Sequence, residues 1–300
     1  MIKYGIIGAN SYIGRHTAHL LLRDNQSVQL YDKDVVSVDN IKDYHKIDFK
    51  KPKTLLTIDE DINVLYFFSG LTGTDKSFTR FEKFIEVNEV ALLRLLNILT
   101  VRKSKTRIIF PSSRLVYKGK KDTPLKENHK KEPKTIYAVN KISCEQYLKI
   151  YNECFGINYT IARICIPYGN LLDETYSYGT IGFMLSRARN GNDISIFGDG
   201  CQKRSFIHIE DLANILISLG SNPKTKGEIF NIGGPDSISI LEVATLIAKK
   251  YDVKIKHIKW PELALSIESG DTIFDSGKIE RLLNYQYRFR LQEWVKSLNQ

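Results

Sequence analysis

The 300-residue sequence has no CxxC cysteine pair and no histidines in an HxH or HExxH pattern. Its four cysteines are Cys144, Cys154, Cys165 and Cys201, and none has a histidine nearby at metal-ligand spacing. The sequence therefore predicts neither a metal site nor a disulfide framework. We expect reduced thiols and a cytoplasmic protein.

Long apolar runs are also missing. No stretch approaches eighteen uninterrupted apolar residues, which excludes a transmembrane helix. We also expect no membrane partner. The N-terminus begins with a strand-like segment, Tyr4–Ile7, and has no apolar leader with a small-residue cleavage site, so we expect no secretion signal. The chain is 42% hydrophobic and 26% charged, which is too apolar for disorder and predicts one large or two modest domains.

Acidic residues are outnumbered, and the formal net charge is +10. The densest basic segment, 118–134, holds seven lysines against Asp122, Glu127 and Glu132. It has no arginine and no interleaved aromatic residue, and it contains two prolines. These features favour a solvated loop over a nucleic-acid surface, so we expect no nucleic-acid partner.

Short β-rich runs alternate with amphipathic helical stretches over the first two thirds of the chain. This rhythm predicts βαβ units and an α/β fold with a doubly wound parallel (Rossmann) sheet. Strands are expected at Tyr4–Ile7, Ser27–Tyr31, Val64–Phe68, Arg107–Phe110 and Tyr159–Ile164. Helices are expected at Gly14–Arg23, Phe78–Leu99 and Ile136–Tyr151.

The alternating rhythm stops near residue 168, where glycines cluster and helices shorten. We therefore expect a cofactor-binding Rossmann domain at 1–168 and a smaller α+β substrate-binding region at 169–300. Part of 203–232 is expected to return to the first domain.

A glycine-rich turn, residues 8–14, follows the first expected strand. In such turns, backbone N–H groups and a helix N-terminus bind a pyrophosphate. Gly8 allows the tight turn, and Gly14 lets the helix approach the sheet. The second strand leads to Asp32, 24 residues past Gly8, where a carboxylate binds an adenosine ribose. Asp32 would repel a 2′-phosphate, which favours NAD over NADP, although Lys33 weakens that preference.

Tyr137 and Lys141 are four residues apart in an expected helix and share one face. An ammonium beside a phenol favours the phenolate and lowers the tyrosine pKa, which gives a general base near neutral pH. Ser113 ends the preceding strand and is expected to reach the same substrate oxygen. Such a pair also arises by chance on protein surfaces.

Motifs along nearly the whole chain resemble, in order, those of extended short-chain dehydrogenases/reductases. The chain is similar in particular to the NAD-dependent epimerase/dehydratase family of sugar-nucleotide enzymes, typified by UDP-glucose 4-epimerase. The matching motifs are Gly8 and Gly14, Asp32, Asp48-Phe49, residues 67–70, Asn88, residues 112–117, Tyr137 and Lys141, Arg163, residues 167–169, residues 196–200, Arg204, Asp211, residues 230–233, Asp275 and Lys278.

The resemblance implies a catalytic triad of Ser113, Tyr137 and Lys141, and Arg204 as a ligand of the nucleotide diphosphate. The expected substrate-binding residues are Ser113, Tyr137 and Arg204. The expected NAD-binding residues are Gly8, Ser11, Tyr12, Ile13, Gly14, Asp32, Asp48, Phe49, Phe68, Ser69 and Lys141. Members commonly dimerise through two helices per subunit, here Phe78–Leu99 and Ile136–Tyr151, so we expect a homodimer.

Three positions depart from the family pattern. Ser11 replaces the middle glycine of the turn, and its hydroxyl could donate to a phosphate. Ile166 replaces an asparagine that members present to the substrate, and Glu268 stands where epimerase-like members carry a phosphate-binding arginine. Arg114 and Leu115 after Ser113 supply no extra acid or base, which disfavours dehydration.

The expected function is a sugar-nucleotide 4-epimerase with retained NAD, acting in the synthesis of surface polysaccharide precursors. The first alternative is a reductase of 4-keto sugar nucleotides that exchanges NAD(P)H at each turnover. A non-enzymatic NAD-binding or RNA-associated module is the second, and the intact triad counts against it. For Arg204 the alternative to a diphosphate ligand is a structural salt bridge with a nearby acid.

Overall fold

The computed structural model describes residues 2–172 and 178–299. The chain forms two compact units, each built from three segments. The first unit comprises Met1–Val116, Pro133–Arg163 and Ala213–Ile229, and the second comprises Tyr117–Glu132, Ile164–Leu212 and Phe230–Gln300. Within the described residues, no helix is long and apolar enough to cross a membrane.

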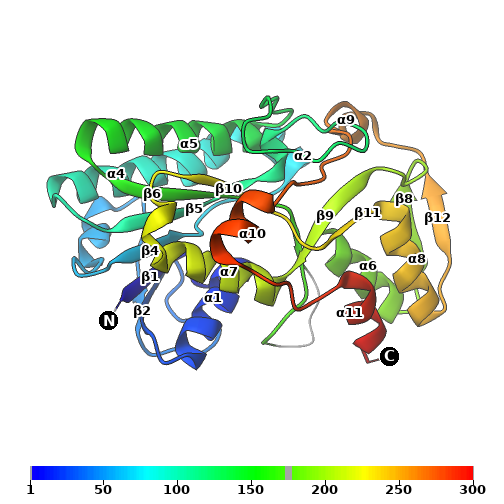
Figure 1. The fold of residues 1–300 in the computed structure, drawn as a ribbon, viewed down its shortest axis with the longest axis horizontal. Coiled ribbons are helices and arrows are strands. Elements are labelled where there is room, and N and C mark those ends of the chain that lie inside the picture. The colour runs from blue at the N-terminus through cyan, green and yellow to red at the C-terminus, as the bar shows by residue number, and fades with distance from the viewer. Residues whose placement is uncertain (1, 173–177, 300) are drawn as a thin grey trace. The chain divides into compact units, whose positions relative to one another are not determined.

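A parallel seven-stranded sheet organises the first unit, and its strand order is β10-β6-β5-β4-β1-β2-β3 (Figure 1). The order reverses direction beside β1, which is the doubly wound topology that the sequence predicts. The strands are β1 (Lys3–Ile7), β2 (Ser27–Asp32), β3 (Tyr44–Lys46), β4 (Val64–Phe67), β5 (Arg107–Ser113), β6 (Asn158–Ile164) and β10 (Ile229–Ile232). β4 is buried at every position, as expected for a strand covered on both faces.

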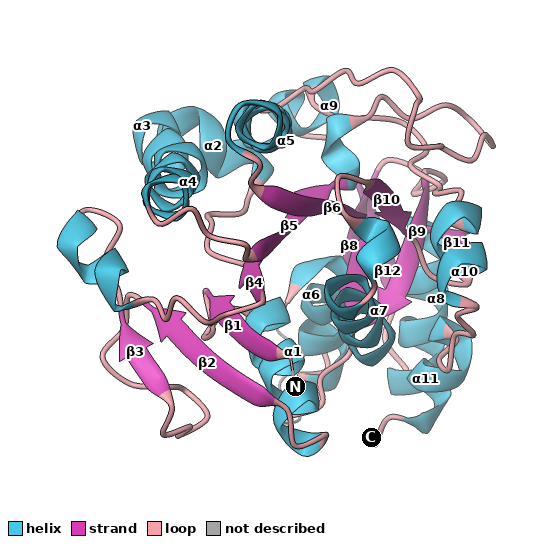
Figure 2. Ribbon diagram, turned by 60° about the vertical axis from the view of Figure 1, so that its left-hand side comes forward, coloured by secondary structure: helices cyan, strands magenta, loops and turns pink. Residues whose placement is uncertain are grey.

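Helices cover both faces of this sheet. Figure 2 shows α4 and α5 on one face and α1 on the other, where the part of α7 from Ala213 on also lies. The helices are α1 (Tyr12–Arg23), α2 (Thr74–Thr79), α3 (Phe81–Ile85), α4 (Ala91–Val101), α5 (Ile136–Phe155) and α7 (Ile209–Ser221). Short helical turns are η1 (Pro52–Thr57), η3 (Arg114–Val116) and η4 (Pro223–Thr225).

Local sequence signals fix the ends of α5. Thr135 precedes the helix, and its hydroxyl accepts a hydrogen bond from the Ala138 amide, which satisfies one of the free N–H groups of the first turn. Gly156 ends the helix in the left-handed conformation, with φ 70°. The buried face of the helix includes Leu148, which belongs to the same apolar cluster as Leu95 of α4.

The prediction of one helix over Phe78–Leu99 is wrong. Arg80, with φ −129°, separates α2 from α3, and residues Glu86–Val90 form a π-helical turn (η2) between α3 and α4. The turn carries two buried polar residues, Asn88 and Glu89, which bond to other elements. The hydrophobic periodicity of this stretch does not indicate the π-helical turn, because the turn accompanies bonds of Asn88 and Glu89 to residues outside the stretch.

The second unit has two small sheets. β9 (Lys203–His208) pairs with β11 (Asp236–Ser239) antiparallel and with β7 (Ile166–Tyr168) parallel, while β8 (Ile194–Phe197) pairs with β12 (Ile255–Ile258). Its helices are α6 (Gly179–Arg189), α8 (Ile240–Tyr251), α9 (Glu262–Ser266), α10 (Gly277–Leu283) and α11 (Leu291–Ser297). One apolar cluster gathers residues of α6, α8 and α11.

The lysine-rich segment 118–134 lies mostly in the second unit. Its backbone bonds to residues 269–275, for example from the Leu125 amide to the Ile273 carbonyl at 2.7 Å. The sequence-based boundary left this segment within residues 1–168, because pairing across about 150 residues has no local signature. Lys118 and Lys130 are exposed and lie 3.1 and 3.8 Å from Glu132, as expected for a solvated loop.

Candidate active site

A cavity of about 640 Å³ opens in the first unit, where the loops after β1, β2 and β4 meet. This is the place at which open parallel sheets bind ligands, and the volume suits a small-molecule site. Seven of the predicted cofactor residues line it: Gly8, Ser11, Asp32, Asp48, Phe49, Phe68 and Ser69. Tyr12, Ile13 and Gly14 form the first turn of α1 and are not among its lining residues.

The glycines of the turn permit close approaches that a side chain would prevent. Gly8 has φ 85°, and a Cβ there would lie 2.5 Å from the Ser69 amide nitrogen. A Cβ on Gly14 would lie 2.2 Å from the Gly8 carbonyl oxygen. The turn thus holds the N-terminus of α1 against the strand ends, where backbone amides and the helix dipole favour an anion.

The side chain of Ser11 caps the N-terminus of α1. Its Oγ donates to the Gly8 carbonyl at 2.6 Å and accepts from the Gly14 amide at 3.2 Å, which makes it the N-cap of α1. The hydroxyl proton is therefore already used within the turn, and the predicted alternative of donation to a phosphate would require this bond to break.

Asp32 ends β2 at the cavity wall, as predicted. Its Oδ2 accepts from the Asn10 amide at 2.8 Å and its Oδ1 from the Lys33 amide at 2.7 Å. Each oxygen retains a lone pair, so the carboxylate can still accept from a ribose diol. Asn10 is a site residue that the sequence did not predict. Its side chain also accepts a hydrogen bond from the Val38 amide at 3.0 Å and donates one to the Val36 carbonyl at 3.1 Å.

The other end of the cavity is lined by Asp48 and Phe49. The Phe49 carbonyl accepts from Nη1 of Arg94 at 2.6 Å, and its ring packs edge-on against Phe67 at 5.7 Å between centroids. Lys50 and Glu86 form an ion pair at 3.0 Å beside it. This arrangement of an apolar ring with polar backbone groups suits a flat heterocycle.

Asn88 of η2 fastens the loop after β4. Its Oδ1 accepts from the Leu71 amide at 2.6 Å, and its Nδ2 donates to the Leu71 carbonyl at 3.1 Å. Ser69 and Gly70, immediately before, line the cavity. The two loops that enclose the cavity are therefore each held by an asparagine from another element, Asn10 and Asn88.

Ser113 lies at the end of β5, and Tyr137 and Lys141 lie in the first turns of α5; none of the three is among the lining residues of the 640 Å³ cavity. Lys141 is only 7% exposed, and its Nζ donates to the Pro111 carbonyl at 2.7 Å. The same ammonium lies 5.7 Å from the centre of the Tyr137 ring. Ser113 is buried, and its Oγ accepts from the Leu115 amide at 3.2 Å.

Burial lowers the pKa of Lys141 to about 8, against the opposing effects of Cys144 and Glu145. The group is thus an ammonium at neutral pH, close to its point of deprotonation. A positive charge held at this distance from a phenol favours the phenolate, and the arrangement can therefore take a proton from a substrate hydroxyl.

The second unit holds Arg204, which is 3% exposed. Its Nη2 lies 2.5 Å from a carboxylate oxygen of Glu268, and its Nη1 donates to the Gly270 carbonyl at 2.6 Å. The structural salt bridge that the sequence left open for Arg204 is therefore present. Ile166, in β7, is buried among apolar residues.

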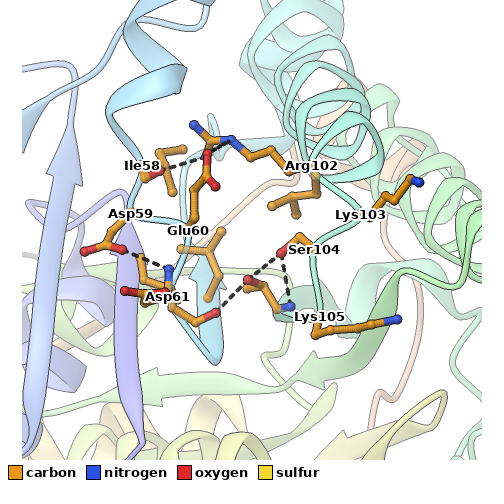
Figure 3. A pocket seen from close by; sticks show the side chains of 12 residues that line it. Ile58, Asp59, Glu60, Asp61, Arg102, Lys103, Ser104 and Lys105 are labelled. Carbon is orange, nitrogen blue, oxygen red and sulfur yellow. Dashed lines mark hydrogen bonds and ion pairs between the residues drawn. The ribbon is translucent and has the colours of Figure 1, made fainter.

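A second cavity in the first unit, of about 300 Å³, lies between residues 58–62 and 102–106 (Figure 3). Several of its polar groups bond to one another: Arg102 pairs with Glu60 at 3.0 Å, and Ser104 donates to Thr106 at 2.8 Å. In residues 2–172 and 178–299, no three His, Cys, Asp or Glu side chains are grouped to hold a metal ion.

Replacing Lys141 by Met should stabilise the protein at pH 7. The unfolded state binds more protons than the folded state between pH 8 and 10.5, so stability rises with pH in this window and the cost of the buried charge is complete below it. Burying the Lys141 charge costs about 3 kcal/mol of folding stability. The methionine variant recovers this but loses the hydrogen bond to Pro111, which is worth about 1 kcal/mol. Urea unfolding of Lys141→Met should show a gain of about 2 kcal/mol.

Lys149→Met, on the same helix, is the control and should change stability by less than about 0.5 kcal/mol. A loss of stability in Lys141→Met would contradict the description of Lys141 as a buried charge that costs folding energy.

Comparison with known proteins shows the family of this chain. A sequence profile of the NAD dependent epimerase/dehydratase family matches residues 5–233. Among curated proteins, the uncharacterized UDP-glucose epimerase YtcB of Bacillus subtilis is 28% identical over 312 residues, which covers 99% of this chain and 96% of that protein. Other relatives are named as a decarboxylase and as dehydratases of sugar nucleotides.

Two solved structures share the fold. The UDP-glucose 4-epimerase of Thermotoga maritima with UDP-glucose has a TM-score of 0.87 at 21% identity, covering 98% of this chain and 96% of the other. That of Thermus thermophilus with NAD has a TM-score of 0.86 at 17% identity, covering 98% and 97%. The glycine turn, Asp32 and the cavity fit NAD, which is the cofactor. The chain belongs to the NAD-dependent epimerase/dehydratase family.

Proposed function

We propose that this protein is a 4-epimerase of nucleotide-diphosphate sugars that retains NAD. The observation that carries the proposal is the buried Lys141 ammonium, 5.7 Å from the Tyr137 ring and bonded to the strand that ends in Ser113. A binding module has no need of a charge kept at such cost beside a phenol. The four free thiols fit the cytoplasmic location that we propose with it.

Residues of the cavity would hold the cofactor. The turn from Gly8 to Gly14 would bind the pyrophosphate, Asp32 the adenosine ribose, and Asp48 with Phe49 the adenine end. Lys141 would bind the second ribose. When bound, NAD supplies an acceptor for a hydride and a source from which it returns.

Tyr137, as the phenolate, would take the proton of the substrate 4-hydroxyl and give it back after the sugar has turned over. Ser113 would orient that hydroxyl and relay the proton. Lys141 would keep the phenolate stable by its charge. The same three residues also serve a reductase of 4-keto sugars, so the distinction depends on whether the cofactor stays bound.

Arg204 is proposed to bind the substrate diphosphate. Its guanidinium is almost fully buried and already holds one anionic partner, the Glu268 carboxylate at 2.5 Å. A phosphate oxygen would replace that carboxylate on Nη2, with the Gly270 carbonyl keeping Nη1 in place. Glu268 would then compete with substrate, as an arginine at that position would not.

A second copy of this chain is proposed to cover an apolar surface on the outer helices of the first unit. The surface comprises Phe78, Phe81, Ile85, Val139 and Ile150 from α2, α3 and α5, of which Phe81 and Ile150 are each 50% exposed. Both α2 and α3 pack against α5, so these side chains belong to one continuous helical layer. Such a layer is more apolar than the surface of a monomer needs.

Tyr137→Phe should lower kcat by about 10²–10⁴ while leaving the fold and NAD binding intact, because it removes the proton-accepting oxygen and keeps the ring. The assay follows interconversion of 4-epimeric UDP-sugars without added cofactor. Ser113→Ala should cost less, since serine only orients and relays the proton.

Tyr151→Phe is the control for this assay. It lies on the same helix, and its hydroxyl bonds to Asn97 at 3.1 Å, outside the site. Near wild-type turnover by Tyr137→Phe would refute the tyrosine-base mechanism. Protein that releases no NAD on denaturation, and turns over only with added NADH or NADPH, would establish the reductase instead.

NAD should bind at least about tenfold more tightly than NADP, or roughly 1.4 kcal/mol, because the Asp32 carboxylate repels a 2′-phosphate. Calorimetric titration of the protein freed of nucleotide measures both affinities. Asp32→Asn should reduce the ratio of the affinity for NAD to the affinity for NADP. Asp39→Asn, in the same loop but paired with Arg15 at 2.6 Å, should not. Equal affinities in the wild type would contradict the assignment.

Light scattering at micromolar concentration should give twice the 34.5 kDa mass of one chain. Phe81→Glu with Val139→Glu places two charges in the apolar surface and should give a monomer that still binds NAD. Glu substitutions at the exposed Val35 and Val36, which lie outside this surface, should leave the dimer intact. A monomeric wild type would rule out the dimer and leave the catalytic proposal unaffected.

A further inference from the structure

The face of α5 that carries Tyr137 and Lys141 continues to Glu145. The three residues follow at intervals of four, so their side chains lie one above the other. Glu145 is 1% exposed, as is its partner Arg163 of β6. The proposed mechanism uses neither of them, although a charge pair at this depth is rare.

Glu145 connects α5 to two strands. The Ser112 hydroxyl donates to its Oε1 at 2.5 Å. Arg163 donates to the same oxygen from Nε at 2.9 Å and to Oε2 from Nη2 at 2.5 Å. Both carboxylate oxygens are therefore held, one of them by the residue that immediately precedes Ser113.

Two successive turns of α5 thus bond to two successive residues at the end of β5. Lys141 binds the Pro111 carbonyl, and Glu145 binds the Ser112 hydroxyl. Neither bond tolerates a shift of the helix along the strand by more than a fraction of an ångström. These two bonds fix the register of α5 along β5, the strand that carries Ser113.

An apolar pair of similar volume would hold the same elements together without the cost of burying two charges. Such a pair would lack two properties that Glu145 supplies, a directed bond to Ser112 and a negative charge one turn from Lys141. We propose that Glu145 is a positioning residue of this active site, which fixes Ser113 through Ser112 and keeps Lys141 in its charged form. The proposal rests on the proposed function of the triad.

The charged and titratable groups around Lys141 within this unit are few. On α5 they are Tyr137, Cys144 and Glu145. Burial raises the pKa of Cys144 to about 12, so this thiol is neutral near pH 7 and Glu145 alone supplies negative charge from the helix. Glu89 of η2 acts on Cys144, and Arg163 of β6 is bonded to Glu145.

Burial already brings the pKa of Lys141 down to about 8, and the charge of Glu145 acts in the opposite direction and favours the ammonium. Without that charge, the pKa of Lys141 would fall by about one unit further, and half of the molecules would lose the ammonium near pH 7. Loss of the ammonium would remove the support of the Tyr137 phenolate.

Glu145→Gln alone leaves a buried arginine unpaired and is a poor test, because it can fail to fold. Two double variants avoid this. Glu145→Gln with Arg163→Met removes both charges and keeps an amide oxygen to accept from Ser112. Glu145→Leu with Arg163→Met removes the charges and that bond. The comparison separates the charge from the hydrogen bond.

Both double variants should shift the alkaline limb of the kcat profile down by about one pH unit. Only the leucine variant should also lose kcat at its optimum, by roughly tenfold, with KM unchanged. If neither double variant shifts the pH profile of kcat, Glu145 does not keep Lys141 charged. If the two double variants have equal kcat values at their optima, Glu145 does not position Ser113 through Ser112.

A measurement without substrate keeps this test independent of the proposed reaction. The pH at which urea stability begins to rise reports the deprotonation of Lys141, and it should move from about 8 to about 7 in both double variants. Adding Lys141→Met should abolish the rise in every background. An onset that stays near 8 would refute the inference, whereas a missing turnover in the wild type would refute only the proposed reaction.

Discussion

The buried ammonium of Lys141 is the constraint around which the first unit arranges its site. An ammonium in a protein interior needs acceptors and compensating charge, or it deprotonates. Here the acceptor is the Pro111 carbonyl at the end of β5, and the rings of Phe110 and Tyr137 lie 4.7 and 5.7 Å away. The contact of α5 with β5 is therefore polar and directional at a place where two apolar surfaces would have packed at a lower free-energy cost.

Fixed polar contacts also hold the loops that line the cavity. Loops after parallel strands have few bonds of their own, yet here each is tied to another element by both ends of an asparagine amide. Asn10 fixes residues 34–38 after β2, and Asn88 fixes Leu71 after β4. These bonds join protein groups to one another, so each loop is held by the protein's own contacts.

Much of this arrangement is visible in the sequence because its signals are local. The glycine turn, the strand that ends in Asp32 and the helix from Ile136 each carry their own spacing or cap, and the structure has them where the patterns predict. The parallel sheet follows from the alternation of short apolar runs with helices. Seven predicted cofactor residues line one cavity because strand ends in such a sheet meet at one edge.

The features that the sequence does not reveal depend on partners far along the chain. The interruption of the helix expected at Phe78–Leu99 accompanies the bonds of Asn88 and Glu89 to Leu71 and Tyr147. Arg204 finds Glu268 across 64 residues. No periodicity or propensity encodes such pairs, because each depends on which loops the folded chain brings together.

The departures from the family pattern differ in what they change. At Ser11 the hydroxyl forms the N-cap of α1, so its hydrogen bonds stay within the turn. At Glu268 a carboxylate faces the buried guanidinium of Arg204, and the diphosphate proposed to bind Arg204 would compete with this ion pair. Truncation of one partner of such a pair costs more than exchange of one anion for another, because exchange never leaves the guanidinium unpaired. In the function proposed above, anionic substrates are selected in the second unit by how well their phosphates replace the Glu268 carboxylate on Arg204, whereas the proton chemistry is carried out by residues of the first unit.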